Sequence, residues 1–186
     1  GMEIRLPPLG KQERTLSTEP KKVMHLSDAD AKLIRSMVIY QDDTVIVLNK
    51  VPGLAVQGGT NTPRHVDGML VALQGDKPEK PKLVHRLDKD TSGVLIIARS
   101  GQAAKALTES FRNRKTNKIY WALVKGKPSQ YEGAVQAPLD KEPGTRGERM
   151  AVSEDGKRAI TDFKVMDSAA GTVTWMAFRP VTGRTH

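Results

Sequence analysis

Apolar residues in this chain gather in short runs that are separated by turn-forming and charged residues. Residues 44–50 form a β-branched, apolar run with two aspartates before it and Pro52-Gly53 after it, which predicts a buried strand. Residues 94–98 are all apolar and predict a second buried strand. The chain between these runs holds several glycines, which indicate turns.

Three stretches carry apolar residues at the spacing of a helix. One helix is predicted to start at Thr62-Pro63, because apolar residues follow at intervals of three and four: Val66, Met69, Leu70 and Leu73. A second helix with a small apolar face is predicted over residues 102–112. Residues 29–38 predict a short helix whose N-cap is Ser27 or Asp28.

The second half of the chain is rich in strand-forming residues and turns. Strands are predicted over residues 118–125, 134–139, 159–166 and 173–178, and residues 168–171 are predicted to join the last two as a hairpin. Strands outnumber helices, and the strands tend to follow one another along the chain. The pattern therefore predicts an α+β fold with a mixed, largely antiparallel β-sheet flanked by helices.

Domain organisation follows from chain length and local composition. The 186 residues suffice for one hydrophobic core, and a second full domain would be cramped. Residues 1–38 are rich in charge and proline, and they predict a basic N-terminal extension that ends in the short helix. Residues 39–186 are then predicted to form a single domain.

Charge and cysteine content narrow the classes of function. Lysine and arginine number 30 against 21 acidic residues, and the net charge of +9 favours a polyanion such as nucleic acid as the partner, although a merely soluble basic surface fits as well. No cysteine is present, which excludes disulfides and cysteine nucleophiles. No apolar stretch approaches the ~20 residues of a membrane span. We expect a monomer in the cytoplasm, with the interior of an organelle as the alternative location.

The densest polar cluster of the sequence is His-Arg-Leu-Asp-Lys-Asp-Thr-Ser-Gly over residues 85–93, directly before the apolar run at 94–98. A polar loop at the end of a buried strand is a common place for a functional site. Aspartate, threonine, serine and glycine are also ordinary turn residues, so a surface turn is the competing interpretation. The composition of the cluster alone leaves both interpretations open.

The same cluster resembles the signature of the RluA-like pseudouridine synthases, in which His-Arg-Leu-Asp-x-x-Thr-Ser-Gly precedes an apolar strand. Three further segments resemble that family in the same order along the chain, namely residues 49–56, 118–120 and 180–186. The resemblance implies that residues 39–186 are the catalytic domain of an RNA pseudouridine synthase, an isomerase that converts uridines of ribosomal or transfer RNA to pseudouridine. Since this isomerisation gains and loses no atoms overall, neither a metal nor a cofactor is expected.

The resemblance also implies roles for individual residues. Asp88 matches the catalytic aspartate, and a carboxylate suits that role because it is ionised at neutral pH without a separate base. Tyr120 matches the tyrosine of the pocket, and Arg86 matches the residue that takes the place of the flipped base. The matching segments hold further residues that are expected to bind substrate: His85, Thr91, Asn49, Lys50, Lys118 and Arg184. Whether Asp88 attacks the sugar or the base stays open, and the reaction is expected to need a pocket without water.

The family pattern extends further than this sequence does. In the family, the segment that matches residues 180–186 continues with Gln-x-Arg, and that arginine is the expected partner of the catalytic aspartate. The catalytic domain is therefore expected to be incomplete at its C-terminus.

Two alternatives to a pseudouridine synthase stay open at this point. A non-catalytic RNA-binding module with the same fold predicts RNA affinity that is unaffected by Asp88→Asn, and no product. Residues 88–91 resemble part of the Asp-x-Asp-x-Thr motif of magnesium-dependent phosphotransferases of the haloacid-dehalogenase type. That motif ends an apolar strand, whereas the apolar strand at residues 94–98 follows it here.

Overall fold

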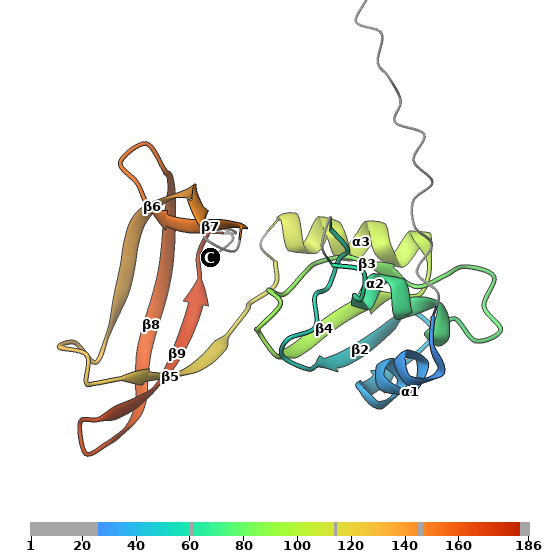
Figure 1. The fold of residues 1–186 in the computed structure, drawn as a ribbon, viewed down its shortest axis with the longest axis horizontal. Helices are drawn as coiled ribbons and strands as arrows, with labels where there is room; N and C mark the ends of the chain where they lie inside the picture. The colour runs from blue at the N-terminus through green and yellow to red at the C-terminus, as the bar shows by residue number, and fades with distance from the viewer. Residues whose placement is uncertain (1–25, 60–61, 114, 145–146, 183–186) are drawn as a thin grey trace, which may run out of the picture.

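The computed structural model describes residues 26–59, 62–113, 115–144 and 147–182. In this part of the chain the strands form two antiparallel sheets, and the helices lie with the first of them (Figure 1). The predicted α+β class is confirmed. The strands are divided between two sheets, however, where the sequence predicts one.

The first sheet brings the end of β2 next to the loop that precedes β4. Its strand order is β1-β2-β4-β3, and neighbouring strands are antiparallel. Its strands are Val38–Gln41 (β1), Val45–Lys50 (β2), Lys82–Leu83 (β3) and Gly93–Ala98 (β4). β2 and β4, the two predicted buried strands, pair over their full length, with Lys50 opposite Gly93. Lys50 therefore lies beside the point where the loop of residues 84–92 enters β4.

Helices close the hydrophobic core of the first sheet. They are Asp28–Ser36 (α1), Val66–Met69 (α2), the 3-10 turn Leu70–Leu73 (η1) and Gly101–Arg112 (α3). The core cluster joins apolar side chains from β2, β4, α1, α2 and η1, including Ile34, Ile46, Leu48, Met69, Leu70 and Leu95. The apolar positions that predict the middle helix, Val66, Met69, Leu70 and Leu73, are all buried. The spacing of apolar residues thus identifies the face that packs on the sheet.

The starts of α1 and α2 are set by capping side chains. Ser27, rather than Asp28, is the N-cap of α1. The predicted helix start at Thr62-Pro63 is wrong, because α2 begins only after His65. The Nδ1 atom of His65 accepts a hydrogen bond from the backbone N–H of Gly68 (3.0 Å) and so caps the helix. A histidine is not among the usual capping residues, which is why the sequence places the start too early.

The second sheet has the strand order β5-β9-β8-β6-β7 with antiparallel neighbours. Its strands are Tyr120–Lys125 (β5), Glu132–Gly144 (β6), Gly147–Val152 (β7), Lys157–Ala169 (β8) and Val173–Pro180 (β9). The predicted hairpin between the last two is confirmed, and its turn contains Ala170 and Gly171 with φ of 49° and 69°. Two residues with positive φ suit a tight hairpin turn, and the second is glycine, which adopts that conformation readily.

One face of β5 and β9 carries large apolar side chains at the surface. Trp121 and Leu123 on β5 are 69% and 74% exposed. Trp121 meets Trp175 of β9 edge to face, with ring centroids 5.2 Å apart. No helix of the described residues packs on this sheet (Figure 1).

The strand predictions fail where the pattern is weak. β1, β3 and β7 are not predicted, because β1 is mostly exposed, β3 has only two residues, and β7 shows no apolar run. The strands predicted at residues 134–139 and 159–166 extend further in both directions, as β6 and β8. They are longer because their backbones continue to pair past the apolar residues, β6 with β8 and then β7, and β8 with β6 and then β9.

The N-terminal region contributes to the core. α1 lies within the predicted extension, yet its Ile34 is fully buried in the core cluster. Residues 1–25 lie outside the described part of the chain. The predicted boundary of the catalytic domain after residue 38 stays a prediction.

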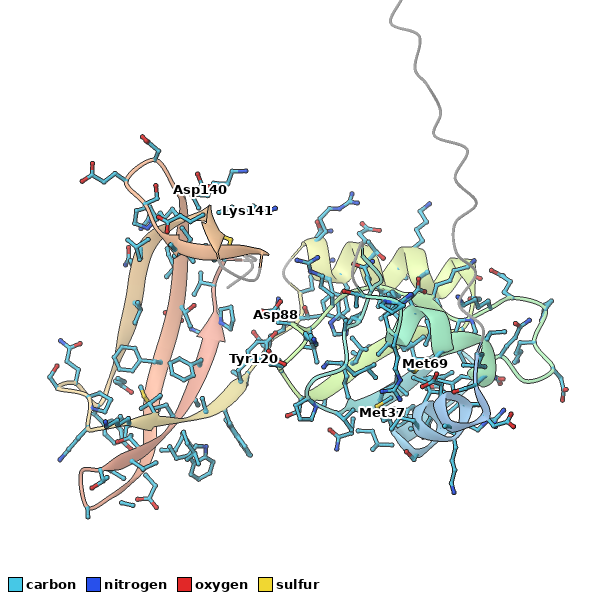
Figure 2. The ribbon with its side chains drawn as sticks, in the orientation of Figure 1. Met37, Met69, Asp88, Tyr120, Asp140 and Lys141 are labelled. Carbon is cyan, nitrogen blue, oxygen red and sulfur yellow. The ribbon has the colours of Figure 1, made fainter. Side chains whose placement is uncertain are left out.

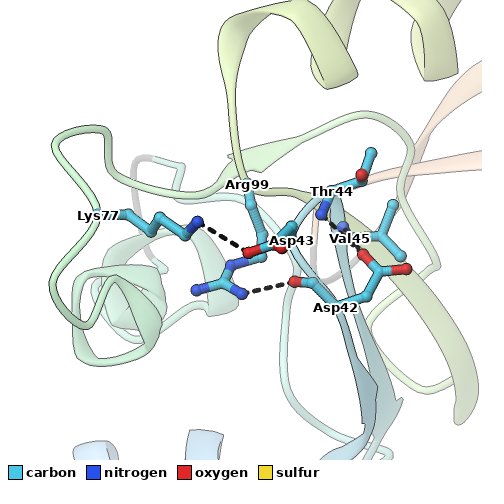
Figure 3. A network of polar contacts seen from close by, with 6 residues as sticks. All are labelled: Asp42, Asp43, Thr44, Val45, Lys77 and Arg99. Atoms are coloured by element: carbon cyan, nitrogen blue, oxygen red, sulfur yellow. Dashed lines mark hydrogen bonds and ion pairs between the residues drawn. The ribbon is translucent and has the colours of Figure 1, made fainter.

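Polar contacts hold the end of the first sheet that is remote from the Asp88 loop (Figure 3). The carboxylate of Asp42 accepts hydrogen bonds from the backbone N–H groups of Thr44 and Val45, both at 2.7 Å, and these bonds lower its pKa. Arg99 donates to the carbonyl of Asp42, and the ammonium of Lys77 lies 2.9 Å from Asp43. These contacts stabilise the β1–β2 turn, so the charged residues at this end of the sheet have a structural role.

Candidate active site

Asp88 lies on the loop that joins β3 to β4. The backbone N–H of Thr91 donates to the carbonyl oxygen of Asp88 (3.1 Å), which closes a turn within the motif. Figure 2 shows Asp88 at the junction of the two sheets, beside Tyr120. Its side chain is exposed. The expected water-free pocket is therefore not formed around Asp88 by the described residues alone.

Tyr120 is the first residue of β5 and approaches Asp88 from the second sheet (Figure 2). Its side chain is partly buried. Burial, and to a lesser degree the negative charge of Asp88, raise the pKa of the Tyr120 hydroxyl above its ordinary value. The hydroxyl is thus protonated at neutral pH and can donate a hydrogen bond. The two residues that the sequence assigns to catalysis come together from different sheets.

Lys50 is fully buried, with 0% of its surface exposed. Its ammonium donates hydrogen bonds to three carbonyl oxygens, those of Val51 (3.0 Å), Leu54 (2.8 Å) and Lys89 (3.0 Å). Burial lowers the pKa of this ammonium, and the charges of Asp90 and Asp88 oppose the change. The RNA contact predicted for Lys50 is incompatible with this burial, because the side chain reaches no surface. Lys50 instead ties the turn after β2 to the Asp88 loop.

His85 is also directed into the protein. Its Nε2 atom accepts a hydrogen bond from the backbone N–H of Ile96 in β4 (2.9 Å), and its ring stacks on Phe111 of α3 with centroids 4.4 Å apart. Burial, followed by the positive charge of Lys118, lowers the pKa of His85 from 6.5 to about 4, while a hydrogen bond to the backbone of Arg86 opposes this. The neutral ring thus anchors the Asp88 loop to β4 and α3. The predicted substrate contact of His85 stays a prediction.

The protein is expected to lose stability as the pH falls from 6.5 towards 4, because the unfolded chain binds a proton to His85 near 6.5 and the folded chain only near about 4. Above 6.5 the ring is neutral in both states, so the contribution of His85 to stability is fully present there. The loss amounts to at most about 3–4 kcal/mol, and partial exposure of the ring reduces it.

Urea unfolding of wild type and His85→Gln at several pH values measures this loss. Glutamine keeps a hydrogen-bond acceptor but does not titrate, so the variant should show a shallower dependence of the free energy of unfolding on pH. All other titrating groups are shared by the two proteins, and equal slopes would contradict the role given to His85.

The remaining predicted site residues occupy different places. Arg86 and Lys118 are exposed, on the Asp88 loop and just before β5 respectively. Thr91 belongs to the turn that begins at Asp88. Asn49 on β2 has an exposed side chain, while its backbone N–H donates to the carbonyl of Met37. Arg184 lies outside the described residues. The structure thus brings Arg86 and Thr91 to the loop of Asp88, and their roles stay predictions.

Two partners in the site are not apparent from the sequence. Phe111 lies within the helix predicted over residues 102–112, but nothing local in the sequence indicates that it stacks on His85. The carbonyl of Lys89, which holds the ammonium of Lys50, is a backbone group and carries no sequence signal at all. Both contacts depend on how distant segments pack.

The family of the chain follows from comparison with known proteins. Residues 44–186 match the family described as RNA pseudouridylate synthase. The chain belongs to this family. The resemblance to the RluA-like pseudouridine synthases is thereby confirmed.

Two similar proteins carry names that describe RNA pseudouridine synthases. The chain is 38% identical over 203 residues to RNA pseudouridine synthase 4, mitochondrial, of Arabidopsis thaliana, covering 96% of this chain and 43% of that protein. It is 40% identical over 192 residues to ribosomal large subunit pseudouridine synthase C of Escherichia coli K12, covering 100% of this chain and 56% of that protein. The chain therefore spans about half the length of these relatives.

Solved structures agree with the fold. Human RNA pseudouridylate synthase domain containing 4 superposes with a TM-score of 0.69 at 28% identity, over 84% of this chain and 63% of that chain. Human RNA pseudouridylate synthase domain containing 1 gives a TM-score of 0.65 at 25% identity, over 90% of this chain and 64% of that chain. The backbone of this chain, with its two sheets, is thus similar to the backbones of these two proteins.

Among the described residues, no group of three or more His, Asp or Glu side chains is placed to hold a metal ion. In the same part of the chain, no helix is long and apolar enough to cross a bilayer.

Proposed function

We propose that this family member isomerises specific uridines of RNA to pseudouridine, with Asp88 as the nucleophile. The observation that carries the proposal is the meeting of Asp88 and Tyr120 at the junction of the two sheets, in a chain of this family (Figure 2). The Escherichia coli relative is named for the large ribosomal subunit, so ribosomal RNA is the first substrate to test, with transfer RNA as the second. The family match leaves the phosphotransferase alternative without support.

The reaction needs one bond broken and one bond made. The bond between N1 of uracil and C1′ of ribose breaks, the base turns, and C5 bonds to C1′. C5 then loses its hydrogen as a proton and N1 gains a proton, so that no atom is gained or lost overall. The carboxylate of Asp88 is the covalent catalyst, which attacks either C1′ or the uracil ring and is released at the end. Tyr120 binds the turning base, either by stacking of its ring or by a hydrogen bond donated from its hydroxyl.

Exposure of Asp88 in the free protein has a consequence for catalysis. A nucleotide inside a helix or a stacked loop must be flipped out before its base reaches the carboxylate. The bound nucleotide then covers Asp88 and excludes water from it, which the described residues alone do not do. Arg86 is exposed two positions before Asp88, where its planar guanidinium suits the gap that the flipped base leaves.

Basic residues near the loop suit the phosphates of RNA. Exposed side chains of this kind lie on the Asp88 loop, at the end of α3 and between α3 and β5, namely Arg86, Lys89, Arg112, Lys115 and Lys118. Contacts with phosphate supply affinity that depends on salt and not on sequence, so binding should weaken as the salt concentration rises. Selection of one uridine then depends on the shape of the RNA around it.

Release of the C5 hydrogen provides the test. RNA that carries tritium at C5 of uridine is incubated with the purified full-length protein, and tritium in the water is measured. Release at a few positions, mapped by sequencing the modified RNA, is the expected result. RNA binding without any release would contradict the proposal and support the non-catalytic RNA-binding module instead.

A further inference from the structure

Lys50 is the one charged side chain that is buried among the described residues. It ends β2 and lies opposite Gly93, the first residue of β4. Removing an ammonium group from water costs several kcal/mol unless it is compensated, so a buried lysine needs an explanation. The proposed reaction has not used this residue.

The hydrogen bonds of Lys50 fill its whole capacity. An ammonium has three donors and no acceptor, and here each donor meets a carbonyl oxygen at 2.8–3.0 Å. Two of these carbonyls belong to Val51 and Leu54, in the turn directly after β2. The third belongs to Lys89, which is 39 positions away in the sequence and is the residue that follows Asp88. The ammonium therefore fixes the main chain next to the nucleophile.

The other side of Asp88 is fixed as well. Three residues before it, His85 accepts a hydrogen bond from Ile96 and stacks on Phe111. The loop is thus held at His85 and at Lys89, and Asp88 lies exposed between these two anchors. The anchors restrict the main chain around Asp88 while its carboxylate stays free to meet a substrate.

The geometry points to Lys50 as a positioning residue for catalysis, which sets the place of the Asp88 carboxylate through the carbonyl of Lys89. This inference rests on the proposed function, because it concerns the same nucleophile. A misplacement of about 1 Å costs about 100-fold in rate for reactions that depend on orientation. Loss of the ammonium frees one end of the loop and should produce a displacement of that order.

Lys50→Met tests the inference, since methionine is unbranched and of similar length but has no charge and no donors. At saturating RNA, the single-turnover rate of tritium release is expected to fall by about 100-fold. The dissociation constant for RNA should stay within about threefold, because a buried side chain makes no contact with the phosphates. A purely stabilising lysine would leave the rate of the folded variant unchanged, and that result would overturn the inference.

Lys32→Met is the matched control, because Lys32 is an exposed lysine of α1. Its rate and affinity should equal those of wild type. Circular dichroism at the assay temperature establishes that each variant is folded. Failure of the proposed function is distinguishable, since wild type itself would then release no tritium, whereas an active wild type with an equally active Lys50→Met rejects only the role of Lys50.

Lys50→Ala provides a second measurement if Lys50→Met does not fold. The truncated side chain leaves a buried space next to three carbonyls, which a small ammonium ion can occupy. Propylammonium present during refolding and assay is expected to restore the rate at least about fivefold, whereas 1-propanol, of similar size but without charge, should not. Equal effects of the two additives, or no effect of either, would overturn the inference.

Discussion

Replacing Asp88 with asparagine should lower the rate of tritium release at saturating RNA by at least about 10,000-fold, the scale seen when a covalent catalyst is removed from an enzyme. Asparagine has nearly the same shape but no negative charge, so it cannot attack the uridine. Asp88 is exposed, and the variant should therefore fold with unchanged stability. Its affinity for RNA should also be retained, because Asp88 is not one of the basic side chains that bind phosphate.

The control for this experiment is Asp140→Asn on β6, which removes the same charge from an exposed position far from Asp88 (Figure 2). It should release tritium at the wild-type rate. Measured turnover by Asp88→Asn comparable to that of Asp140→Asn would mean that another group is the nucleophile. If wild type and both variants bind RNA equally and none releases tritium, the chain is an RNA-binding module.

Leu48→Ala is expected to lower the free energy of unfolding by about 2–5 kcal/mol. Leu48 is completely buried in β2 and pairs with Leu95 of β4, and both belong to the core cluster of the first sheet. Shortening the side chain removes apolar contacts and leaves a cavity that the close-packed strands cannot fill. Denaturant unfolding followed by far-ultraviolet circular dichroism measures the change.

Val94→Ala on β4 is the matched control, because Val94 is 58% exposed and belongs to the same sheet. It loses strand propensity but creates no cavity, so its effect should stay below about 1 kcal/mol. Similar losses in the two variants would show that burial in this core does not determine the stability of the first sheet.

The sequence predicts the elements of the fold whose residues are buried in regular patterns. β2 and β4 are recognised because each is a run of apolar, mostly β-branched residues, and the face of α2 and η1 is recognised from its helical spacing. β1 and β7 are missed, because they are held by backbone pairing with neighbours that local composition does not reveal. The division of the strands into two sheets is likewise a property of long-range pairing.

For the candidate site, the motif predicts which positions matter but not where their side chains point. Lys50 and His85 are part of the matching segments, and both are assigned to the substrate by resemblance. In the structure both point inward and hold the backbone on either side of Asp88. The information that decides this is the register of β2 on β4 and the packing of α3, neither of which is contained in a local pattern.

Trp121 and Trp175 are the two tryptophans of the entire chain, and both lie on the second sheet, in contact with each other. Intrinsic fluorescence excited at the indole band therefore reports on the second sheet alone, and the first sheet, with the Asp88 loop, is silent to it. RNA that binds near β5 and β9 would quench this tryptophan fluorescence. A comparison of fluorescence emission with circular dichroism during unfolding can accordingly tell whether the two sheets, which carry Asp88 and Tyr120, unfold together or one after the other.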